Sequence, residues 1–452
     1  MKAATLGYWG FLYGASCMLP SLVKNRRLRQ IIGWCLPAVG VLLMVIQRDE
    51  PPVIRLFTAS VVFVYVFKGS ILMMEPRSLP ATMGLWRMLA YMTVWPGMDP
   101  SGFMEARSAV PESGSRFVRG LLFIYFGLAL AFGLAVFYPA ISPNAVEWIG
   151  IAAVLLVVHF GVSEILSSLA NLLGFKVGPL FDRPLRSRSL SEFWTLRWNR
   201  PFVEMDRRLF LRPLSRLFGM KGAVLCVFLV SGLLHEMAIS YPAGSGYGGP
   251  LGYFAIQGIA VLIERRLKLQ SRLLTWIAVL APMPLLFHAP FRRAFIGPLF
   301  NWLNQTLVSH SAGWYVDNGL WLVGFMQLLV LMASFQVPKR LGWREDLPKL
   351  STFNRKLMWT NGSFIVLTIV AFGTLTLSLH SAFMRRETAA IGLAIFITTF
   401  WTMRLLADCV YYKHEDWPKG QQFVIGHALL DSLFSSLVLG YGSYIVWAIA
   451  AH

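Results

Sequence analysis

The sequence predicts an all-α fold, a polytopic transmembrane helical bundle of about 11–12 spans with interfacial helices between some of them. Three observations support this fold class. Of the 452 residues, 56% are hydrophobic and only 14% are charged, against about 25% charged in an average soluble domain. Apolar runs recur along the chain, and many are close to the roughly 20 residues that cross a bilayer. Lys and Arg gather in the segments between these runs.

The apolar runs extend over the whole chain, so we expect a single membrane domain, 1–452, and not a soluble core with an anchor. The first run follows a single Lys2 and has no clear small-residue cleavage site, so we expect it to be retained as a span. The expected spans lie near 5–20, 31–46, 53–74, 118–138, 145–173, 222–241, 251–264, 273–290, 318–337, 359–379, 389–412 and 422–450.

The basic residues predict a consistent orientation in the membrane. If the loop at 24–30 is cytoplasmic and the spans alternate, the basic segments 174–221, 264–272 and 338–358 all fall on the cytoplasmic side, and both termini lie outside. Segment 174–221 alone holds eleven basic and four acidic residues. Two arginine pairs do not follow this pattern, Arg292–Arg293 and Arg385–Arg386.

The net charge of +19 is therefore explained by membrane topology, and we expect no nucleic-acid partner. Basic loops also attract anionic headgroups and polyanionic cosubstrates.

The four cysteines are far apart within apolar runs, and neither CxxC nor HExxH spacing occurs, so we expect no metal site.

Two expected cytoplasmic segments, 75–117 and 174–221, are too long for plain connectors and interleave aromatic with charged residues, which is typical of interfacial helices. In the second segment, Ser189 and Glu192 have capping-box spacing and predict a helix start. Pro201 predicts that this helix ends or kinks after Asn199, which leaves a polar amide at a helix terminus near the membrane. On the residues alone, an interfacial helix with an aromatic belt and no catalytic function is the favoured interpretation, and a catalytic role is the alternative. The aromatic face would consist of Leu190, Phe193, Trp194 and Trp198.

A histidine and a glutamate lie side by side in the run that forms the sixth expected span. His235 and Glu236 are costly in hydrocarbon, and ionisable residues within spans are functional candidates. Ser231 and Gly232 are small and lie one turn away, so another helix or a substrate could approach closely. Histidine can act as a general base near neutral pH. The alternative is a buried histidine that bonds to a neighbouring helix.

The motif FWTLRWN spans 193–199, and the motif SGLLHE spans 231–236. In this order and spacing, the two resemble the membrane-bound O-acyltransferase superfamily, most of all its wax-synthase branch. The stretch 92–97 is similar to a segment upstream of these motifs in that branch. The resemblance covers about 80–335 and implies a catalytic core there, whereas the additional helices at 359–452 match no family.

The resemblance implies an enzyme that transfers an acyl group from acyl-CoA to a hydroxyl of a lipid-like acceptor. It implies that His235 is the catalytic general base, that Asn199 accompanies it, and that an internal tunnel holds the acyl chain. Acyl-CoA would be a cosubstrate, with no tightly bound cofactor and no metal. The protein would be a multi-pass protein of the cell membrane in a bacterium or of the endoplasmic reticulum in a eukaryote. Residues expected to contact substrate are Trp194, Arg197, Trp198, Ser231 and Glu236.

Two alternatives remain open at this stage, namely acyl or acetyl transfer to a sugar hydroxyl and a polytopic transporter or scaffold without chemistry. A transporter predicts an internal repeat with interrupted helices, which the sequence lacks. The last two expected spans carry Arg404 and Asp408, and His427 and Asp431, each pair at i,i+4. We expect these four side chains to form a self-neutralising network between the two helices, and a site for a substrate headgroup is the alternative.

Overall fold

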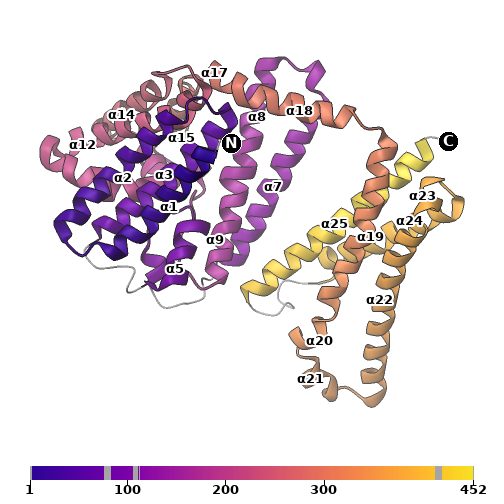
Figure 1. Ribbon diagram of the computed structural model, residues 1–452. Coiled ribbons are helices and arrows are strands. Elements are labelled where there is room, and N and C mark those ends of the chain that lie inside the picture. Colours follow the sequence, from indigo (N-terminus) through magenta and orange to yellow (C-terminus); the bar gives the residue numbers. More distant parts are fainter. Residues whose placement is uncertain (1–2, 76–82, 105–109, 111, 413–419, 451–452) are drawn as a thin grey trace. The chain divides into compact units, whose positions relative to one another are not determined.

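A computed structural model describes residues 3–75, 83–104, 110, 112–412 and 420–450. The protein is 84% helical, and its described residues form no strand, which confirms the predicted all-α membrane fold (Figure 1). The chain divides into two compact units, unit 1 (Met1–Asn304) and unit 2 (Gln305–His452). The predicted limits of the catalytic core, 80–335, stay a prediction.

The first half of unit 1 consists of two groups of packed helices. Helix α3 packs on both α1 and α2, and α7 packs along the helix that runs from α8 through η3 to α9. The short elements between these groups belong to the predicted interfacial segment 75–117, part of which lies outside the described residues. The bounds are α1 (Ala3–Leu22), α2 (Arg26–Ile46), α3 (Pro52–Met74), α5 (Leu85–Leu89), η1 (Ala90–Val94), α6 (Ser101–Met104), α7 (Ser113–Val136), η2 (Tyr138–Ala140), α8 (Pro143–Val154), η3 (Leu155–Val162) and α9 (Ser163–Leu172).

The second half of unit 1 contains both sequence motifs. Helix α12 packs against α14, and the short helices α10 and η5 lie beside them. Gly219 interrupts α12 with φ 66° and ψ 172°, a conformation that glycine adopts without strain. The bounds are η4 (Pro184–Arg186), α10 (Leu190–Glu192), η5 (Phe193–Arg197), α11 (Arg200–Asp206), η6 (Arg207–Leu211), α12 (Arg212–His235), η7 (Glu236–Ser240), α13 (Tyr241–Ala243), α14 (Gly249–Leu267), α15 (Arg272–Leu280), α16 (Met283–Leu286), α17 (Ala289–Phe291), η8 (Arg292–Ile296) and α18 (Gly297–Val308).

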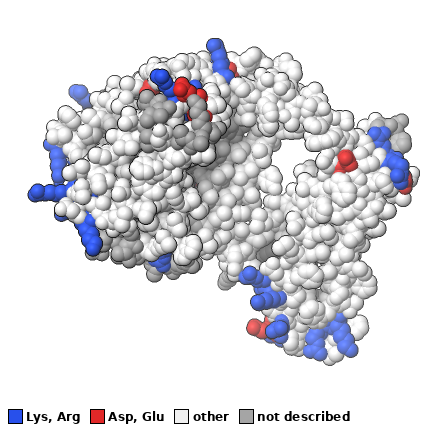
Figure 2. Space-filling view, viewed as in Figure 1, with Lys and Arg blue, Asp and Glu red and all other residues white. Residues whose placement is uncertain are grey.

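Unit 2 is a helical bundle with its own core. The buried Trp401 ring stacks on Phe434 at 4.6 Å, and its Nε1 donates to Gln327 at 3.1 Å. Lys and Arg gather at the two ends of this bundle, by α20–α21 and by α23, with uncharged surface between them (Figure 2). The bounds are α19 (Ala312–Ser334), α20 (Val337–Arg340), α21 (Trp343–Asp346), η9 (Leu347–Lys349), α22 (Thr352–Ser378), α23 (His380–Met384), α24 (Thr388–Val410) and α25 (Gln421–Ala450).

Eight helices among the described residues are long and apolar enough to cross a membrane, and a pair bent by 65° makes a ninth if it counts as one span. The protein is therefore an integral, multi-pass membrane protein. The sequence predicted about twelve spans. Three of the predicted spans, 5–20, 31–46 and 251–264, coincide with α1, α2 and α14, which are helical but are not among those eight.

Three of the four arginines that broke the charge pattern, Arg292, Arg385 and Arg386, have local partners. Arg292 is buried, its Nε donates to Glu147 at 3.0 Å, and its guanidinium lies 4.5 Å from the Trp148 ring centre. Arg385 pairs with Glu387 at 2.8 Å, and Arg386 lies 4.0 Å from the ring centre of Trp447. Packing and ion pairing within each unit thus explain the positions of these three arginines without reference to membrane orientation.

Lys68 of α3 anchors the segment 91–95, which precedes α6, by hydrogen bonds to its backbone. Its side chain is fully buried, and its Nζ donates to the carbonyl oxygens of Tyr91 and Trp95. We expect Lys68→Met to leave both carbonyls unpaired and to lower the free energy of unfolding by about 1–3 kcal/mol. Thermal unfolding in detergent measures this loss. The matched Lys24→Met variant, at an exposed position, should unfold like the wild type, and an equal loss in both variants would contradict the structural role of Lys68.

Candidate active site

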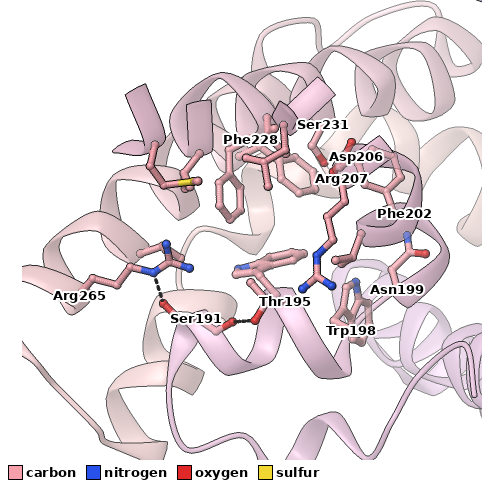
Figure 3. Close-up of a pocket in the computed structure, with 18 of the residues that line it drawn as sticks. Ser191, Thr195, Trp198, Asn199, Phe202, Asp206, Arg207, Phe228, Ser231 and Arg265 are labelled. Carbon is pink, nitrogen blue, oxygen red and sulfur yellow. Dashed lines mark hydrogen bonds between the residues drawn. The ribbon is translucent and has the colours of Figure 1, made fainter. Parts of the chain in front are cut away.

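One cavity in unit 1 brings together five of the residues that the motifs predicted. His235, Asn199, Trp194, Trp198 and Ser231 all line a space of about 260 Å³ (Figure 3). Its walls come from η5, α11, η6, α12 and α14, and most of them are apolar or aromatic. The other lining residues are Ser191, Thr195, Phe202, Val203, Asp206, Arg207, Leu211, Met220, Val224, Val227, Phe228, Phe254, Val261 and Arg265.

The predicted capping box begins the helix that carries the first motif. The Ser189 hydroxyl accepts from the Glu192 backbone N–H at 3.0 Å. Glu192 does not return the bond to Ser189 as a full capping box would, and instead accepts from the Arg188 N–H at 2.7 Å. This N–H and the guanidinium of Arg197 lower the pKa of Glu192. The start of the helix is thus fixed, and Trp194 and Trp198 follow at defined positions.

Asn199 lies at a helix terminus, as predicted, but at the beginning of a helix and not at the end of one. The preceding helix η5 ends at Arg197, and Pro201 lies in the first turn of α11, where its missing N–H costs nothing. Asn199 is the N-cap of α11 and has a left-handed backbone with φ 42°, which asparagine tolerates better than most residues. The aromatic helix ends before Pro201, as predicted, but it ends at Arg197, two residues earlier than expected, and Pro201 belongs to the helix that follows. The side chain of Asn199 nevertheless lines the cavity.

His235 has one ring nitrogen engaged within its own helix. Its Nδ1 lies 2.7 Å from the Ser231 carbonyl oxygen. A carbonyl can only accept, so Nδ1 carries the hydrogen and the lone pair of the neutral ring is on Nε2. The Phe254 ring of α14 packs on the imidazole at 4.3 Å between ring centres. The site thus contains a fixed imidazole with a free lone pair, which is what a general base requires.

Gly232 allows α14 to approach this histidine. A Cβ atom at Gly232 would lie 2.9 Å from the Leu251 Cα, a distance that real contacts do not reach. Helices α12 and α14 therefore pack closely at the level of His235, as the small residues of the motif predicted. This close packing brings Phe254 onto the ring.

Sequence reasoning missed Gln257, which holds the Trp194 wall in place. The indole Nε1 of Trp194 donates to Gln257 Oε1 at 3.0 Å, and Gln257 Nε2 donates to the Ala278 carbonyl at 2.7 Å. Gln257 is fully buried. The available signal was an amide in the middle of the apolar run 251–264, because a buried amide needs partners.

Two predicted substrate contacts lie outside the cavity lining. Glu236 accepts from the N–H groups of Gly248 and Leu251, at 2.9 and 3.0 Å, and so binds the N-terminus of α14. Arg197 pairs with Glu192 at 2.6 Å and donates to the Asp182 carbonyl at 3.2 Å. These bonds hold Arg197 and one oxygen of Glu236, whereas Glu236 Oε2 is buried without a partner, and the roles of both residues in substrate binding stay predictions.

A polar groove, which we call the arginine groove, adjoins the first motif on its other side. It is lined by Arg186, Arg188, Arg197 and Arg272, with Ser189, Glu192 and Gln270, and has a volume of about 620 Å³. A second polar cavity of about 510 Å³ shares Glu192 and Arg197 with the groove. It also shares Thr195, Val203 and Arg207 with the His235 cavity. The three spaces are therefore neighbours along one short stretch of chain.

The four polar residues of the last two helices come together in unit 2, as expected. Arg404 pairs with Asp408 at 2.5 Å on α24, and His427 of α25 lies 3.8 Å from Asp408 and 3.2 Å from Asp431. The Asp408, His427 and Asp431 ligand atoms all lie within 4.8 Å of one another. Arg404 already balances Asp408, so this geometry supports the self-neutralising network over a metal site.

Fold and cavity together define a polytopic helical membrane protein with an ionisable, largely apolar pocket. A family model described as "Membrane bound O-acyl transferase family" matches residues 177–256, which include the first motif, the second motif and all the residues that line this pocket except Val261 and Arg265. The chain thus resembles the membrane-bound O-acyltransferase superfamily over this segment, and the predicted resemblance is confirmed.

The similar curated proteins point to the wax-synthase-like branch of that superfamily. "Probable long-chain-alcohol O-fatty-acyltransferase 2" of Arabidopsis thaliana is 31% identical over 109 residues, which are 22% of this chain and 32% of that protein. "Long-chain-alcohol O-fatty-acyltransferase" of Simmondsia chinensis is 29% identical over 105 residues, 21% of this chain and 30% of that protein. The matched segments therefore span about a third of the length of these relatives.

The two hydrogen bonds of Glu236 generate a stability prediction. We expect Glu236→Ala to leave the first turn of α14 uncapped and to lower the free energy of unfolding by about 1–2 kcal/mol. Thermal unfolding in detergent tests this, with Glu345→Ala, at an exposed position of α21, as the matched control. Unchanged stability of Glu236→Ala would contradict the capping role and favour the predicted substrate contact instead.

Proposed function

We propose that the protein is a membrane-embedded O-acyltransferase that moves an acyl group from acyl-CoA to a hydroxyl of a lipid-like acceptor. The observation that carries the proposal is the His235 imidazole, which lines a cavity and has its Nδ1 committed to the Ser231 carbonyl. The family match over the same residues and the names of the similar plant proteins support acyl transfer to an alcohol.

In this mechanism, His235 Nε2 removes the proton of the acceptor hydroxyl as its oxygen attacks the thioester carbonyl carbon. The negative charge that develops on the carbonyl oxygen needs a hydrogen-bond donor, and the Asn199 amide at the cavity wall or a backbone N–H would supply it. One such donor contributes about 3–4 kcal/mol in other acyl-transfer enzymes. Collapse of the tetrahedral intermediate breaks the carbon–sulfur bond, and the imidazolium returns its proton to the leaving thiolate. The products are an ester and free coenzyme A.

The neighbouring spaces suit the two ends of acyl-CoA. Four arginines line the arginine groove, and guanidinium groups bind phosphates strongly. The second polar cavity shares residues with both the groove and the His235 cavity, so a pantetheine arm could run between them. The apolar walls around His235, among them Val224, Val227 and Phe228, suit an acyl chain or a lipid acceptor.

The His235→Ala variant tests the central step. We expect at least a 100-fold fall in ester formation, because general-base catalysis contributes about 10²–10⁴-fold. The measurement is ester product from radiolabelled palmitoyl-CoA and a long-chain alcohol, with purified protein in detergent. His310→Ala, outside the cavity, is the matched control, and matching thermal unfolding of both variants shows that the fold is intact. Undiminished turnover in His235→Ala would remove this residue from the mechanism.

The arginine groove predicts a selective effect on the donor. We expect the double variant Arg186→Gln, Arg272→Gln to raise KM for acyl-CoA about tenfold, because charge-assisted hydrogen bonds to phosphate are lost. The KM for the alcohol and kcat should change little. Steady-state kinetics with each substrate varied in turn give the answer, with Arg344→Gln, Arg355→Gln as the matched pair in unit 2. An unchanged KM for acyl-CoA would exclude the groove as the nucleotide site.

A further inference from the structure

One acidic side chain in the His235 cavity has no role in the mechanism above. Asp206, the last residue of α11, lines the cavity and is 7% exposed. Its Oδ1 is buried without a hydrogen-bond partner, and no ion pair joins Asp206 to a cation among the described residues. An acceptor oxygen in this state is costly, because a buried acceptor that loses its bonds to water forfeits about 1–3 kcal/mol or more.

Transfer to a simple long-chain alcohol does not use this group. Such an acceptor has one hydroxyl proton, and His235 takes it. With this acceptor bound, Asp206 would stay unpaired in a cavity from which the chain excludes water. Buried polar groups in native proteins nearly always have a partner, and a bound acceptor with a second donor can supply it here. The unpaired Oδ1 is therefore suited to a second hydrogen-bond donor on the acceptor.

The charges around the cavity indicate which kind of donor this is. Arg207 and Arg265 line the same cavity, and the Arg207 side chain extends toward Thr195 and Trp198 in the view of Figure 3. Two guanidinium groups disfavour a cationic amine in a space of this size. A neutral hydroxyl pairs with Asp206 without adding charge.

We infer that the acceptor is a lipid-like polyol, with a second hydroxyl close to the one that is acylated and bound by Asp206. This inference rests on the proposed function and specifies its acceptor class. Asp206 takes no part in proton transfer to or from the reacting oxygen, and it selects the substrate by accepting one hydrogen bond. A site built to bind a substrate hydroxyl discriminates strongly against an analogue that lacks it.

The test compares two acceptors that differ by one hydroxyl, hexadecane-1,2-diol and hexadecan-1-ol, with radiolabelled palmitoyl-CoA as donor. We expect the wild type to use the diol with a kcat/KM about tenfold higher. In Asp206→Leu, the ratio of kcat/KM for the diol to kcat/KM for hexadecan-1-ol should fall to about one. Asp206→Asn keeps the shape and one acceptor oxygen and should show an intermediate preference. If Asp206→Leu does not fold, the comparison between the wild type and Asp206→Asn tests the inference. Asp346→Leu, at an exposed position in unit 2, is the matched control.

The outcomes separate this inference from the proposed function. Equal use of both acceptors by the wild type, or a diol preference that persists in Asp206→Leu, would overturn the polyol assignment and leave acyl transfer standing. Better use of 2-aminohexadecan-1-ol than of the diol would also overturn it. If the wild type esterifies neither acceptor, the proposed acyltransferase function fails, and the polyol inference fails with it.

Discussion

The geometry of the site depends on the hydrogen bond between His235 Nδ1 and the Ser231 carbonyl. An imidazole in an apolar span must find a partner for its N–H, and this ring finds it one turn back on its own helix. The bond leaves the lone pair on Nε2 and frees the ring from any need for a partner on another helix. Gly232 then lets α14 come close enough for Phe254 to pack on the ring. The rest of the cavity is arranged around this fixed ring.

Several other buried polar groups in the described part of unit 1 have hydrogen-bond partners within the protein. Glu236 binds two N–H groups of α14, Gln257 joins Trp194 to the Ala278 carbonyl, and Lys68 binds two carbonyl oxygens. Each of these groups ties two elements together, and the protein itself provides the hydrogen bonds. Asp206 Oδ1 and Glu236 Oε2 are both buried without a partner, but the Asp206 side chain makes no hydrogen bond to the described residues and lines the His235 cavity. A polar group that faces a cavity without a partner is available to a ligand, which burial alone does not show.

The sequence was sufficient for the fold class and for the centre of the site, because both depend on local patterns. Apolar runs predicted the helices, and the two motifs predicted five residues that do line one cavity. The features that sequence reasoning did not predict depend on contacts between residues far apart in the chain, or on where a short helix begins. Glu236 has its partners at Gly248 and Leu251, and sequence reasoning did not predict that a second helix, α11, begins at Arg200. Asp206 and Arg207 were missed because this second helix, with η6 directly after it, places them at the cavity.

The spacing within FWTLRWN has a physical reason in this arrangement. Trp194 and Trp198, four residues apart, face the His235 cavity, whereas Arg197 faces the arginine groove. Phe193 is buried and stacks on Trp198 at 5.3 Å between ring centres. One short helix thus forms the wall between the apolar His235 cavity and the basic arginine groove. Thr195 lines both the His235 cavity and the second polar cavity. A substrate with an apolar chain and a polyanionic head matches both sides of this wall. The motif therefore specifies a partition between two environments as well as a set of side chains, and its aromatic and basic positions are not interchangeable.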